Sequence, residues 1–214
     1  MKAVTTDPRA RSTYRHGDLR RALLEAGIEL ARTGGPDAVV LREATRRAGV
    51  VPNAAYRHFA SRQELLQAVR AAALSSLALA MESDLARLRR SRRPDDHARA
   101  SLRAVGTAYL RFAQAQPGLF RTAFSALEAP ERDADPAKAG HSGMNPFQLL
   151  SAALDRMVDA GVLASSRRPG AEYLAWSAVH GLAVLIIDGP LRGLDEAQSH
   201  AAGQRLLDMV EKGL

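Results

Sequence analysis

The residues best suited to chemistry lie together between positions 51 and 62. Tyr56, Arg57 and His58 put a phenol, a guanidinium and an imidazole on consecutive positions, and Asn53 adds an amide three residues earlier. Phenols, guanidinium groups and imidazoles can donate hydrogen bonds to phosphate oxygens, and a carboxamide can pair with the major-groove edge of adenine. The cluster therefore indicates contact with a nucleic acid.

Simpler interpretations of these residues remain open. Tyr56 can be a core aromatic, as Phe59 is expected to be. His58 can be a packed or capping histidine, and Asn53 can simply favour the start of a helix. The elements that carry the cluster have to decide between these interpretations.

A helix and a tight turn are predicted before the cluster. Leu41, Ala44, Thr45 and Ala48 recur at spacings of three, one and three, which places a small, mostly apolar stripe on one face of a helix over 41–48. Gly49 follows and can adopt the positive φ that ends a helix sharply. A helix, a tight turn and a second helix allow that second helix to enter the DNA major groove while the first braces it.

The second helix of this motif is predicted over 52–59. Pro52 suits the first position of a helix, because its missing N–H is no loss there. The helical phase then separates an inward set from an outward set that faces the groove. We expect Val50, Ala55 and Phe59 to face inward, and Pro52, Asn53, Ala54, Tyr56 and Arg57 to face outward.

Residues 14–70 resemble the DNA-binding region of the TetR family of regulators. The resemblance rests on Ala48-Gly49-Val50, on Tyr56-Arg57-His58-Phe59 and on Ser61-Arg62, which occur together in register. It implies phosphate contacts for the tyrosine and histidine of the second motif and for the arginine of the third. The DNA-binding residues expected in this chain are Val51, Pro52, Asn53, Tyr56, Arg57, His58 and Arg62.

The chain departs from the family pattern at two positions. Val40 and Val51 stand just before the two motif helices, where the family usually has threonine or serine. Valine offers no side-chain acceptor to the first N–H groups of a helix, which costs about 0.5–2 kcal/mol per site. Val51 also lacks the hydroxyl with which a serine would bind a phosphate.

Positive charge is concentrated in the N-terminal part of the chain. The 214 residues carry a formal net charge of +7. Residues 1–62 hold 12 Lys and Arg against 6 Asp and Glu, whereas residues 127–214 hold 8 against 12. A basic segment on a milder remainder is typical of a nucleic-acid-binding head on a separate body.

The sequence argues against several other classes of protein. It holds no cysteine, which excludes disulfides, a thiolate nucleophile and a cysteine-based zinc site. Gly-x-Ser-x-Gly, His-Glu-x-x-His and a phosphate-binding glycine loop are absent, and the six histidines lack metal-ligand spacing. We therefore expect no enzyme, no cofactor and no bound metal.

Membrane insertion and export are not expected either. The longest apolar run, over 174–187, is interrupted by Ser177 and His180 and is shorter than the roughly 20 residues that span a bilayer. The first residues lack the apolar region of a secretory signal. Because the lack of cysteine also fits a reducing compartment, we expect a cytoplasmic protein.

Helical periodicity without β alternation predicts an all-α chain of about nine helices. We expect a flexible basic arm over 1–13, a three-helix helix-turn-helix domain over 14–62 and a helical ligand-sensing and dimerisation domain over 63–214. Residues 127–146, rich in Pro, Gly and charge, are interpreted as a mobile segment that can cover a pocket. Besides the two motif helices, helices are expected over 18–33, from 62 to about 90, and over 95–115, 117–126, 146–160, 170–187 and 194–212.

The body resembles one C-terminal subfamily of these regulators. The resemblance rests on Tyr109-Leu110-Arg111-Phe112, Pro117-Gly118-Leu119-Phe120 and Trp176-x-x-x-His180-Gly181, and it implies a ligand-sensing and dimerising domain. Apolar residues from several helices predict a ligand pocket formed by Phe112, Phe120, Phe124, Leu150, Met157, Trp176 and His180. An apolar band on the last two helices predicts a homodimer interface formed by Ala175, Val179, Leu182, Ala183, Ile186, Leu206, Leu207 and Val210.

Each of these two sets can instead belong to the core of a single chain, and His180 can be a histidine satisfied inside that core. The first functional hypothesis is a repressor that binds a double-stranded DNA operator as a homodimer and is released by a small apolar or amphipathic effector. The effector would tilt the long helix that begins near residue 62 and so change the separation of the recognition helices. A constitutive DNA-binding regulator without a ligand and an activator remain as alternatives.

Overall fold

The computed structural model describes residues 16–89, 91, 93–126 and 135–214. The described residues form helices and turns without a strand, which confirms the predicted all-α class. The predicted arm over 1–13 lies outside them. The helices are α1 (His16–Gly34), α2 (Leu41–Arg47), α3 (Pro52–Ala55), α4 (Arg62–Ala86), α5 (Pro94–Ala115), α6 (Pro117–Ala123), α7 (Pro146–Asp159), α8 (Ala171–Ile187) and α9 (Glu196–Gly213), with the short 3-10 turns η1 (Pro36–Ala38), η3 (Pro136–Lys138) and η4 (Ser165–Arg167).

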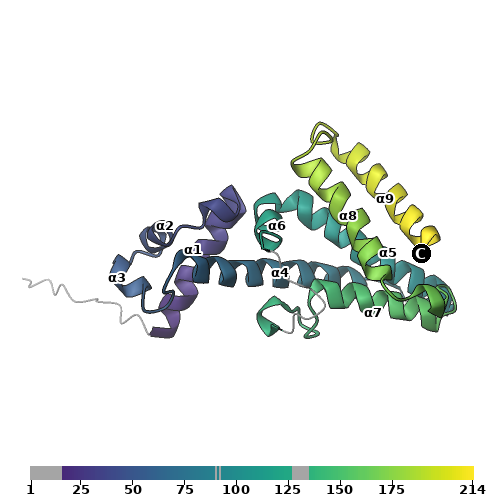
Figure 1. Ribbon diagram of the computed structural model, residues 1–214, viewed down its shortest axis with the longest axis horizontal. Coiled ribbons are helices and arrows are strands. Elements are labelled where there is room, and N and C mark those ends of the chain that lie inside the picture. Colours follow the sequence, from purple (N-terminus) through teal and green to yellow (C-terminus); the bar gives the residue numbers. More distant parts are fainter. Residues whose placement is uncertain (1–15, 90, 92, 127–134) are drawn as a thin grey trace, which may run out of the picture.

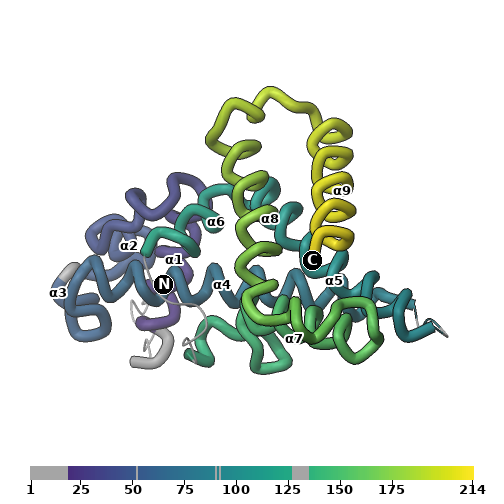
Figure 2. The backbone as a smooth tube through the Cα atoms, turned by 45° about the vertical axis from the view of Figure 1, so that its right-hand side comes forward, coloured from purple at the N-terminus to yellow at the C-terminus, as the bar shows by residue number. Residues whose placement is uncertain are grey.

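The long helix α4 runs through the whole molecule and joins its two parts (Figures 1 and 2). One end of α4 packs against α1. Helices α2 and α3 also pack against α1 and complete the head. The other end packs against α5, α6, η3 and α7 of the body, on which α8 and α9 are laid. Leu65 and Val69 are buried in the head and Leu77 and Met81 in the body, so α4 contributes to both ends of one continuous core.

A polar cap fixes the start of α4. The Ser61 hydroxyl accepts a hydrogen bond from the Glu64 N–H at 3.2 Å, and the Glu64 carboxylate accepts one from the Ala60 N–H at 2.7 Å. Two donors that the helix itself cannot satisfy are thereby paired. The cap between Ser61 and Glu64 therefore defines the start of α4, and the helix runs for 25 residues and ends at Ala86 rather than near residue 90 as expected.

Among the described residues, α4 is the one helix whose length and composition would allow it to cross a membrane. Half of its most apolar window is buried inside the protein, however. A core helix needs apolar residues around much of its circumference because it packs against neighbours on several sides. The apolar character of α4 is thus explained by its contacts within this fold.

The segment before α7 is fastened to α4. Ser75 donates a hydrogen bond from its hydroxyl to the Ala139 carbonyl at 2.7 Å. The Glu82 carboxylate accepts hydrogen bonds from the N–H groups of His141 and Ser142 at 2.8 and 2.9 Å. The interpretation of 127–146 as a mobile segment is therefore wrong for residues 135–145, while residues 127–134 lie outside the described part of the chain.

Candidate functional site

The turn between α2 and α3 has the geometry that its glycine predicts. Gly49 adopts φ +68°, and its neighbour Val50 donates from its N–H to the Thr45 carbonyl at 3.1 Å. Ala44 and Thr45 are buried beneath the turn. Small buried side chains on α2 let the following helix lie close against it, which sets the angle at which α3 leaves the head.

The helix α3 is a single turn and ends before the aromatic–basic cluster. It spans Pro52–Ala55, whereas the sequence predicted a helix to residue 59. The next residues form a turn in which the N–H groups of His58 and Phe59 both donate to the Ala55 carbonyl at 2.9 Å. Because the chain must then extend to reach the Ser61 cap of α4, the helix cannot continue.

Burial separates most of the predicted inward and outward residues, whereas Val50 and Ala54 are both partly buried. Ala55 and Phe59 are fully buried, whereas Tyr56 is 57% exposed and Val51 69% exposed. Asn53, Arg57 and the half-buried His58 lie on the same exposed end of the head. Tyr56 is therefore not a core aromatic. The predicted surface is solvent-accessible, although its contacts with DNA stay a prediction.

Arg62 has partners inside the head. Its Nε donates to the Val39 carbonyl at 2.8 Å, and its Nη2 donates to the Pro36 carbonyl at 2.9 Å. These bonds tie the first turn of α4 to the segment around η1. In the free protein Arg62 is therefore a positioning residue, and the phosphate contact implied by the family resemblance stays a prediction.

Two further contacts in the head had not been predicted. The guanidinium of Arg20 lies 4.9 Å from the centre of the Phe59 ring, which fits a cation–π contact between α1 and the turn after α3. The Glu43 carboxylate accepts hydrogen bonds from Arg46 at 2.6 and 2.8 Å and from Arg47 at 3.3 Å. These arginines lower the pKa of Glu43 to about 2, so it stays ionised and offsets part of the positive charge of α2.

The two motif helices lack side-chain caps, as the sequence predicted. Val40 and Val51 occupy the cap positions of α2 and α3 with extended backbones, and neither side chain accepts a hydrogen bond. In α3, Pro52 has no N–H and the Ala54 N–H donates to the Val51 carbonyl at 3.0 Å, so the Asn53 N–H is the donor that a capping side chain would have paired. It lies at the exposed end of the head, where a phosphate oxygen would be a suitable acceptor.

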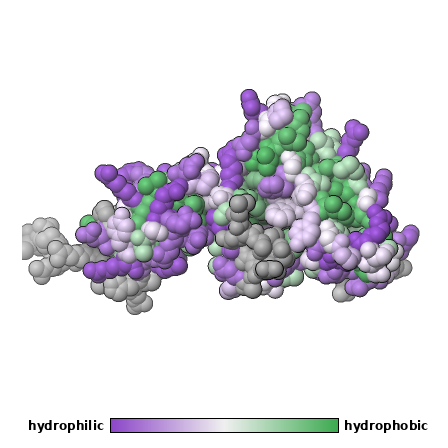
Figure 3. Space-filling view, viewed as in Figure 1, coloured by the Kyte–Doolittle hydropathy of each residue, from purple (hydrophilic) through white to green (hydrophobic). Residues whose placement is uncertain are grey.

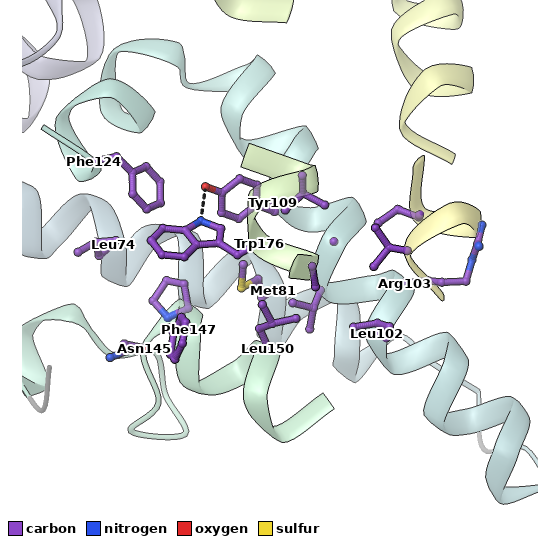
Figure 4. A pocket seen from close by; sticks show the side chains of 17 residues that line it. Leu74, Met81, Leu102, Arg103, Tyr109, Phe124, Asn145, Phe147, Leu150 and Trp176 are labelled. Atoms are coloured by element: carbon purple, nitrogen blue, oxygen red, sulfur yellow. Dashed lines mark hydrogen bonds between the residues drawn. The ribbon is translucent and has the colours of Figure 1, made fainter. Parts of the chain in front are cut away.

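A cavity of about 80 Å³ lies inside the body between α4, α5, α6, α7, α8 and α9 (Figure 4). Three of the predicted pocket residues, Phe124, Leu150 and Trp176, line it. The main wall residues that sequence reasoning missed are Leu74, Met81, Tyr109 and Phe147. Tyr109 belongs to the motif Tyr109-Leu110-Arg111-Phe112, and its aromatic ring could have indicated a place in the pocket wall.

Four predicted pocket residues lie outside this wall. Phe112, Phe120 and Met157 are buried in the surrounding core, because their helices turn these positions toward other neighbours. His180 is not among the described lining residues, and its Nδ1 lies 2.7 Å from the hydroxyl of Tyr109, which does line the cavity. The aromatic residues of the prediction are thus close together, but fewer of them reach the cavity than expected.

A short hydrogen-bonded chain supports the cavity wall. The indole N–H of Trp176 donates to the Tyr109 hydroxyl at 3.1 Å (Figure 4). Burial raises the pKa of the Tyr109 phenol and lowers the pKa of His180, so both side chains are neutral near pH 7. The Tyr109 hydroxyl thus accepts from Trp176 and lies within hydrogen-bond distance of the His180 ring nitrogen, which holds both rings in place without any ionised group.

The residues predicted for a dimer interface face the interior of the chain. Ala183 and Ile186 are buried in this single chain. Ala175, Val179, Leu207 and Val210 are buried as well and line the cavity, whereas Leu182 and Leu206 are only partly buried.

The face of α8 that the structure leaves exposed is the opposite one. Leu174 is 67% exposed and Leu185 42% exposed, and hydrophobic surface gathers over α8 (Figure 3). On α9, Met209 is 60% exposed. Helix α8 is apolar around its whole circumference, so its periodicity could not indicate which side faces solvent.

The helix α6 connects the body with the head. Gly118 lies so close to the end of α1 that an added Cβ would be 2.2 Å from the Ala31 carbonyl oxygen. Arg121, one turn later, donates from Nε to the Asp188 carboxylate at the end of α8 at 2.9 Å. The last residues of α6 lead to Phe124 in the cavity wall. The cavity, α8 and α1 are therefore all in contact with this one short helix.

Comparisons with known proteins agree with this architecture. Residues 23–69 match the family described as bacterial regulatory proteins, tetR family, and residues 102–210 match the tetracyclin repressor-like C-terminal domain. No curated protein sequence matches the chain. Among solved structures, a protein with unknown function from Rhodococcus sp. RHA1 is 28% identical, with a TM-score of 0.74 over 95% of this chain and 99% of that chain.

Two more distant structures share the fold and carry bound molecules. FadR from Bacillus subtilis in complex with stearoyl-CoA is 14% identical, with a TM-score of 0.65 over 91% of this chain and 98% of that one. RolR in complex with resorcinol is 18% identical, with a TM-score of 0.57 over 91% of this chain and 88% of that one. The two family matches together cover the head and most of the body. The chain belongs to the TetR family and is a DNA-binding transcription regulator.

Proposed function

We propose that this regulator is a repressor that binds a double-stranded DNA operator as a homodimer and leaves it when a small apolar or amphipathic effector occupies the cavity. The observation that carries the proposal is the shared use of α4. Leu74 and Met81 of this helix line the cavity, while Leu65 and Val69 form part of the head core. A rigid helix that is displaced at one end moves at the other, so the cavity and the head are mechanically coupled.

A second connection supports the same coupling. Phe124 follows α6 and lines the cavity, whereas Gly118 of α6 rests against the carbonyl oxygens at the end of α1. An effector that shifts Phe124 therefore presses on α1 as well as on α4. Such an effector must bind the DNA-incompetent arrangement more tightly than the competent one, since equal affinity would shift nothing.

The DNA contacts proposed here follow from exposure and chemistry. We assign a base contact to Asn53, and phosphate contacts to Tyr56, Arg57 and His58. All four stand at the exposed end of the head. The short α3 would enter the major groove with its N-terminal end first, as recognition helices of this motif do.

The homodimer is proposed to form through the exposed face of α8. Leu174, Ala178, Gly181 and Leu185 follow one another at helical spacing on this face, and an added Cβ on Gly181 would meet no neighbour within 4 Å. Small residues let two helices approach closely, and two-fold symmetry matches two operator half-sites. In the Trp-x-x-x-His-Gly motif, Trp176 lines the cavity while Gly181 faces solvent, which supports reading this motif as a subfamily signature.

The structural neighbours support a small-molecule role for the cavity. FadR is seen with stearoyl-CoA and RolR with resorcinol, so this fold accommodates molecules of very different size. A regulator of this kind would act in the cytoplasm, where the chromosome lies. Whether it represses or activates depends on where the operator lies relative to the promoter.

The DNA-binding proposal is tested by a gel shift with the DNA upstream of the protein's own gene. We expect a complex that outcompetes random duplex and weakens steeply between 50 and 200 mM salt, by a factor of about 1,000 or more for six or more phosphate contacts. Equal affinity for random duplex would contradict an operator. A reporter gene behind the same DNA separates repression from activation, and an unchanged reporter in a deletion strain would contradict both.

The dimer proposal is tested by sedimentation. Introducing charge with Leu174→Glu and Leu185→Glu together should convert a dimer into a monomer at micromolar concentration, because four carboxylates would be buried in the interface. Val51→Glu is a matched control, since Val51 is equally exposed but lies in the head. A wild-type monomer, or a dimer that survives the double change, would contradict this interface.

A further inference from the structure

Charge around the cavity is fully compensated within the protein. Among the described residues that line the cavity, Arg103 is the one charged side chain. Its Nη2 donates to the Gln204 amide oxygen at 2.8 Å, and its Nη1 donates to Asp208 and, at 3.5 Å, to Glu211. Arg99 donates to the same Glu211 at 2.8 Å. An anionic ligand would have to displace carboxylates that already hold this arginine, and the described part of the wall offers no carboxylate to hold a cationic ligand.

The neutral polar groups of the wall are engaged by the fold. The Tyr109 hydroxyl lies between Trp176 and His180, as described above. The Asn145 side-chain oxygen accepts from the Gln148 N–H at 2.9 Å in the capping box that starts α7. A ligand that brought several hydrogen-bonding groups into the cavity would leave them poorly paired, which is costly in an apolar site.

The two ends of the cavity differ in chemical character. Phe124, Phe147 and the Trp176 ring lie at one end, with the centroids of Phe124 and Phe147 each 6.0 Å from that of Trp176 (Figure 4). These side chains are partly exposed and form a mouth. The other end is mostly aliphatic, with Leu102 and Leu207 both buried there beside Arg103 (Figure 4).

The cavity is also narrow for its length. Leu74 and Met81 both line it and are seven residues apart on α4, which corresponds to about 10 Å along the helix axis. Its volume is only about 80 Å³. This is about half of the roughly 150 Å³ of a cavity that holds benzene, so an aromatic ligand has to widen the space. A slender molecule that lies along α4, with one flat end and one flexible end, requires the least widening.

We propose that the cavity takes a neutral aromatic molecule with an alkyl substituent, and that it rejects carboxylates, phosphates and ammonium ions. The ring lies among Phe124, Phe147 and Trp176, where edge-to-face contacts are available. The alkyl group points toward Leu102 and Leu207. This inference rests on the proposed function only in taking the cavity as the effector site, and it narrows the effector to a class without an ionised group.

The experiment uses the intrinsic fluorescence of Trp176, which is the single tryptophan of the chain. Propylbenzene, 3-phenylpropanoate and 3-phenylpropylammonium share one carbon skeleton and differ at the end of the chain. Propylbenzene should change the fluorescence saturably, and both ions should bind at least about 100-fold more weakly because their charge would be buried without a partner. Equal or tighter binding of either ion, or no saturable binding of propylbenzene, would overturn the proposal.

Two variants locate the binding. Leu74→Phe narrows the mouth and should weaken propylbenzene binding about tenfold, while Leu24→Phe, in the head, should leave it unchanged. No loss of affinity in Leu74→Phe, or an equal loss in both variants, would contradict the assignment. If Leu74→Phe does not fold, the comparison of the three probes on the wild-type protein still decides the question.

Operator binding is measured separately in the same preparation. Saturable propylbenzene binding without release of the operator DNA would leave the ligand class standing and contradict the proposed effector role. Loss of sequence-specific DNA binding in the absence of any probe would contradict the proposed function alone. The two proposals can therefore fail independently.

Discussion

The two helices of the DNA-binding motif and two helices of the body begin in opposite ways. In the head, α2 and α3 start at Val40 and Val51, which offer no side-chain acceptor. In the body, α7 and α9 start at Asn145 and Asp195, and each of these residues forms a complete reciprocal capping box, although α5, α6 and α8 have no side-chain cap. The missing caps of α2 and α3 leave backbone donors without a side-chain acceptor in the part of the molecule where a DNA backbone could accept from them.

Two tyrosines make the same contrast. Tyr109 is 3% exposed, and its hydroxyl is bonded to neighbours on α8. Tyr56 is 57% exposed on the turn that follows α3. A phenol that is fixed inside the fold contributes to shape, whereas an exposed phenol beside basic residues is placed for an external partner. The contrast teaches that the body is organised around its own interior and the head around an external surface.

The largest effect is expected where the two regions meet. Gly118→Ala would place a Cβ 2.2 Å from the Ala31 carbonyl oxygen and 2.4 Å from that of Arg32, so backbone must move. We expect a loss of about 3 kcal/mol in unfolding free energy, as found for overpacking against rigid neighbours. Urea denaturation measures this loss. Gly193→Ala is the control, because no atom lies within 4 Å of its added Cβ. A Gly118→Ala protein as stable as the control would show that head and body are only loosely joined.

The next effect concerns the external surface of the head. Tyr56→Ala should weaken operator binding by about 10- to 100-fold, which corresponds to the loss of about 1–3 kcal/mol expected for one specific contact. The melting temperature should not change, because the side chain is exposed. Fluorescence anisotropy with operator DNA and thermal melting measure the two quantities. Tyr173→Ala changes an exposed tyrosine of α8 and is the control. It should change neither the affinity for operator DNA nor the ratio of that affinity to the affinity for random duplex.

A smaller effect is expected at the clamp that fastens the segment before α7. Burial alone would raise the pKa of Glu82, but the hydrogen bonds from Ser142 and His141 outweigh it and leave that pKa lowered. The ionised carboxylate therefore stabilises the fold above its ordinary pKa of about 4.3, and this contribution is lost as the pH falls through the lowered value. Glu82→Gln should cost about 1–2 kcal/mol at pH 7.

Denaturation at several pH values tests the sign of this effect. The difference in stability between the wild type and Glu82→Gln should shrink below about pH 4. The same change in the head, Glu25→Gln, should cost less than about 0.5 kcal/mol, because this side chain is 64% exposed in a weak surface ion pair. A stability difference between the wild type and Glu82→Gln that does not depend on pH would show that the Glu82 side chain is not bound as an anion.

The head was largely predictable because its signals are local. Gly49 requires a positive φ, Pro52 starts a helix and Ser61 caps one, and each of these properties depends on a few neighbouring residues. The early end of α3 was not predictable in the same way. It depends on how the chain must bend to bring Ser61 into place, which is a property of the assembled head.

The body was predictable only in its elements. Which face of α8 is buried depends on how α8 packs against α5 and α9. Because α8 is apolar on all sides, its sequence pattern does not indicate which face that is. The cavity wall depends on the rotation of six helices about their own axes. Phe120 and Phe147 illustrate this, since the predicted Phe120 turns into the core and the unpredicted Phe147 reaches the cavity.

The smallest effect is expected from adding a side-chain cap at the start of α2, and it tests the comparison between capped and uncapped helices. Val40 has the extended backbone of a cap residue and is 42% exposed. Val40→Thr therefore adds a hydroxyl acceptor without creating a cavity in the hydrophobic core. We expect a gain of about 1 kcal/mol and a rise of roughly 2–4 °C in the melting temperature. Val39→Thr is the matched control, because the neighbouring Val39 is fully buried and its hydroxyl would have to be hidden from water. An unchanged or lower melting temperature for Val40→Thr would mean that water already satisfies the first N–H groups of α2. The missing caps would then reveal nothing about a partner outside the head.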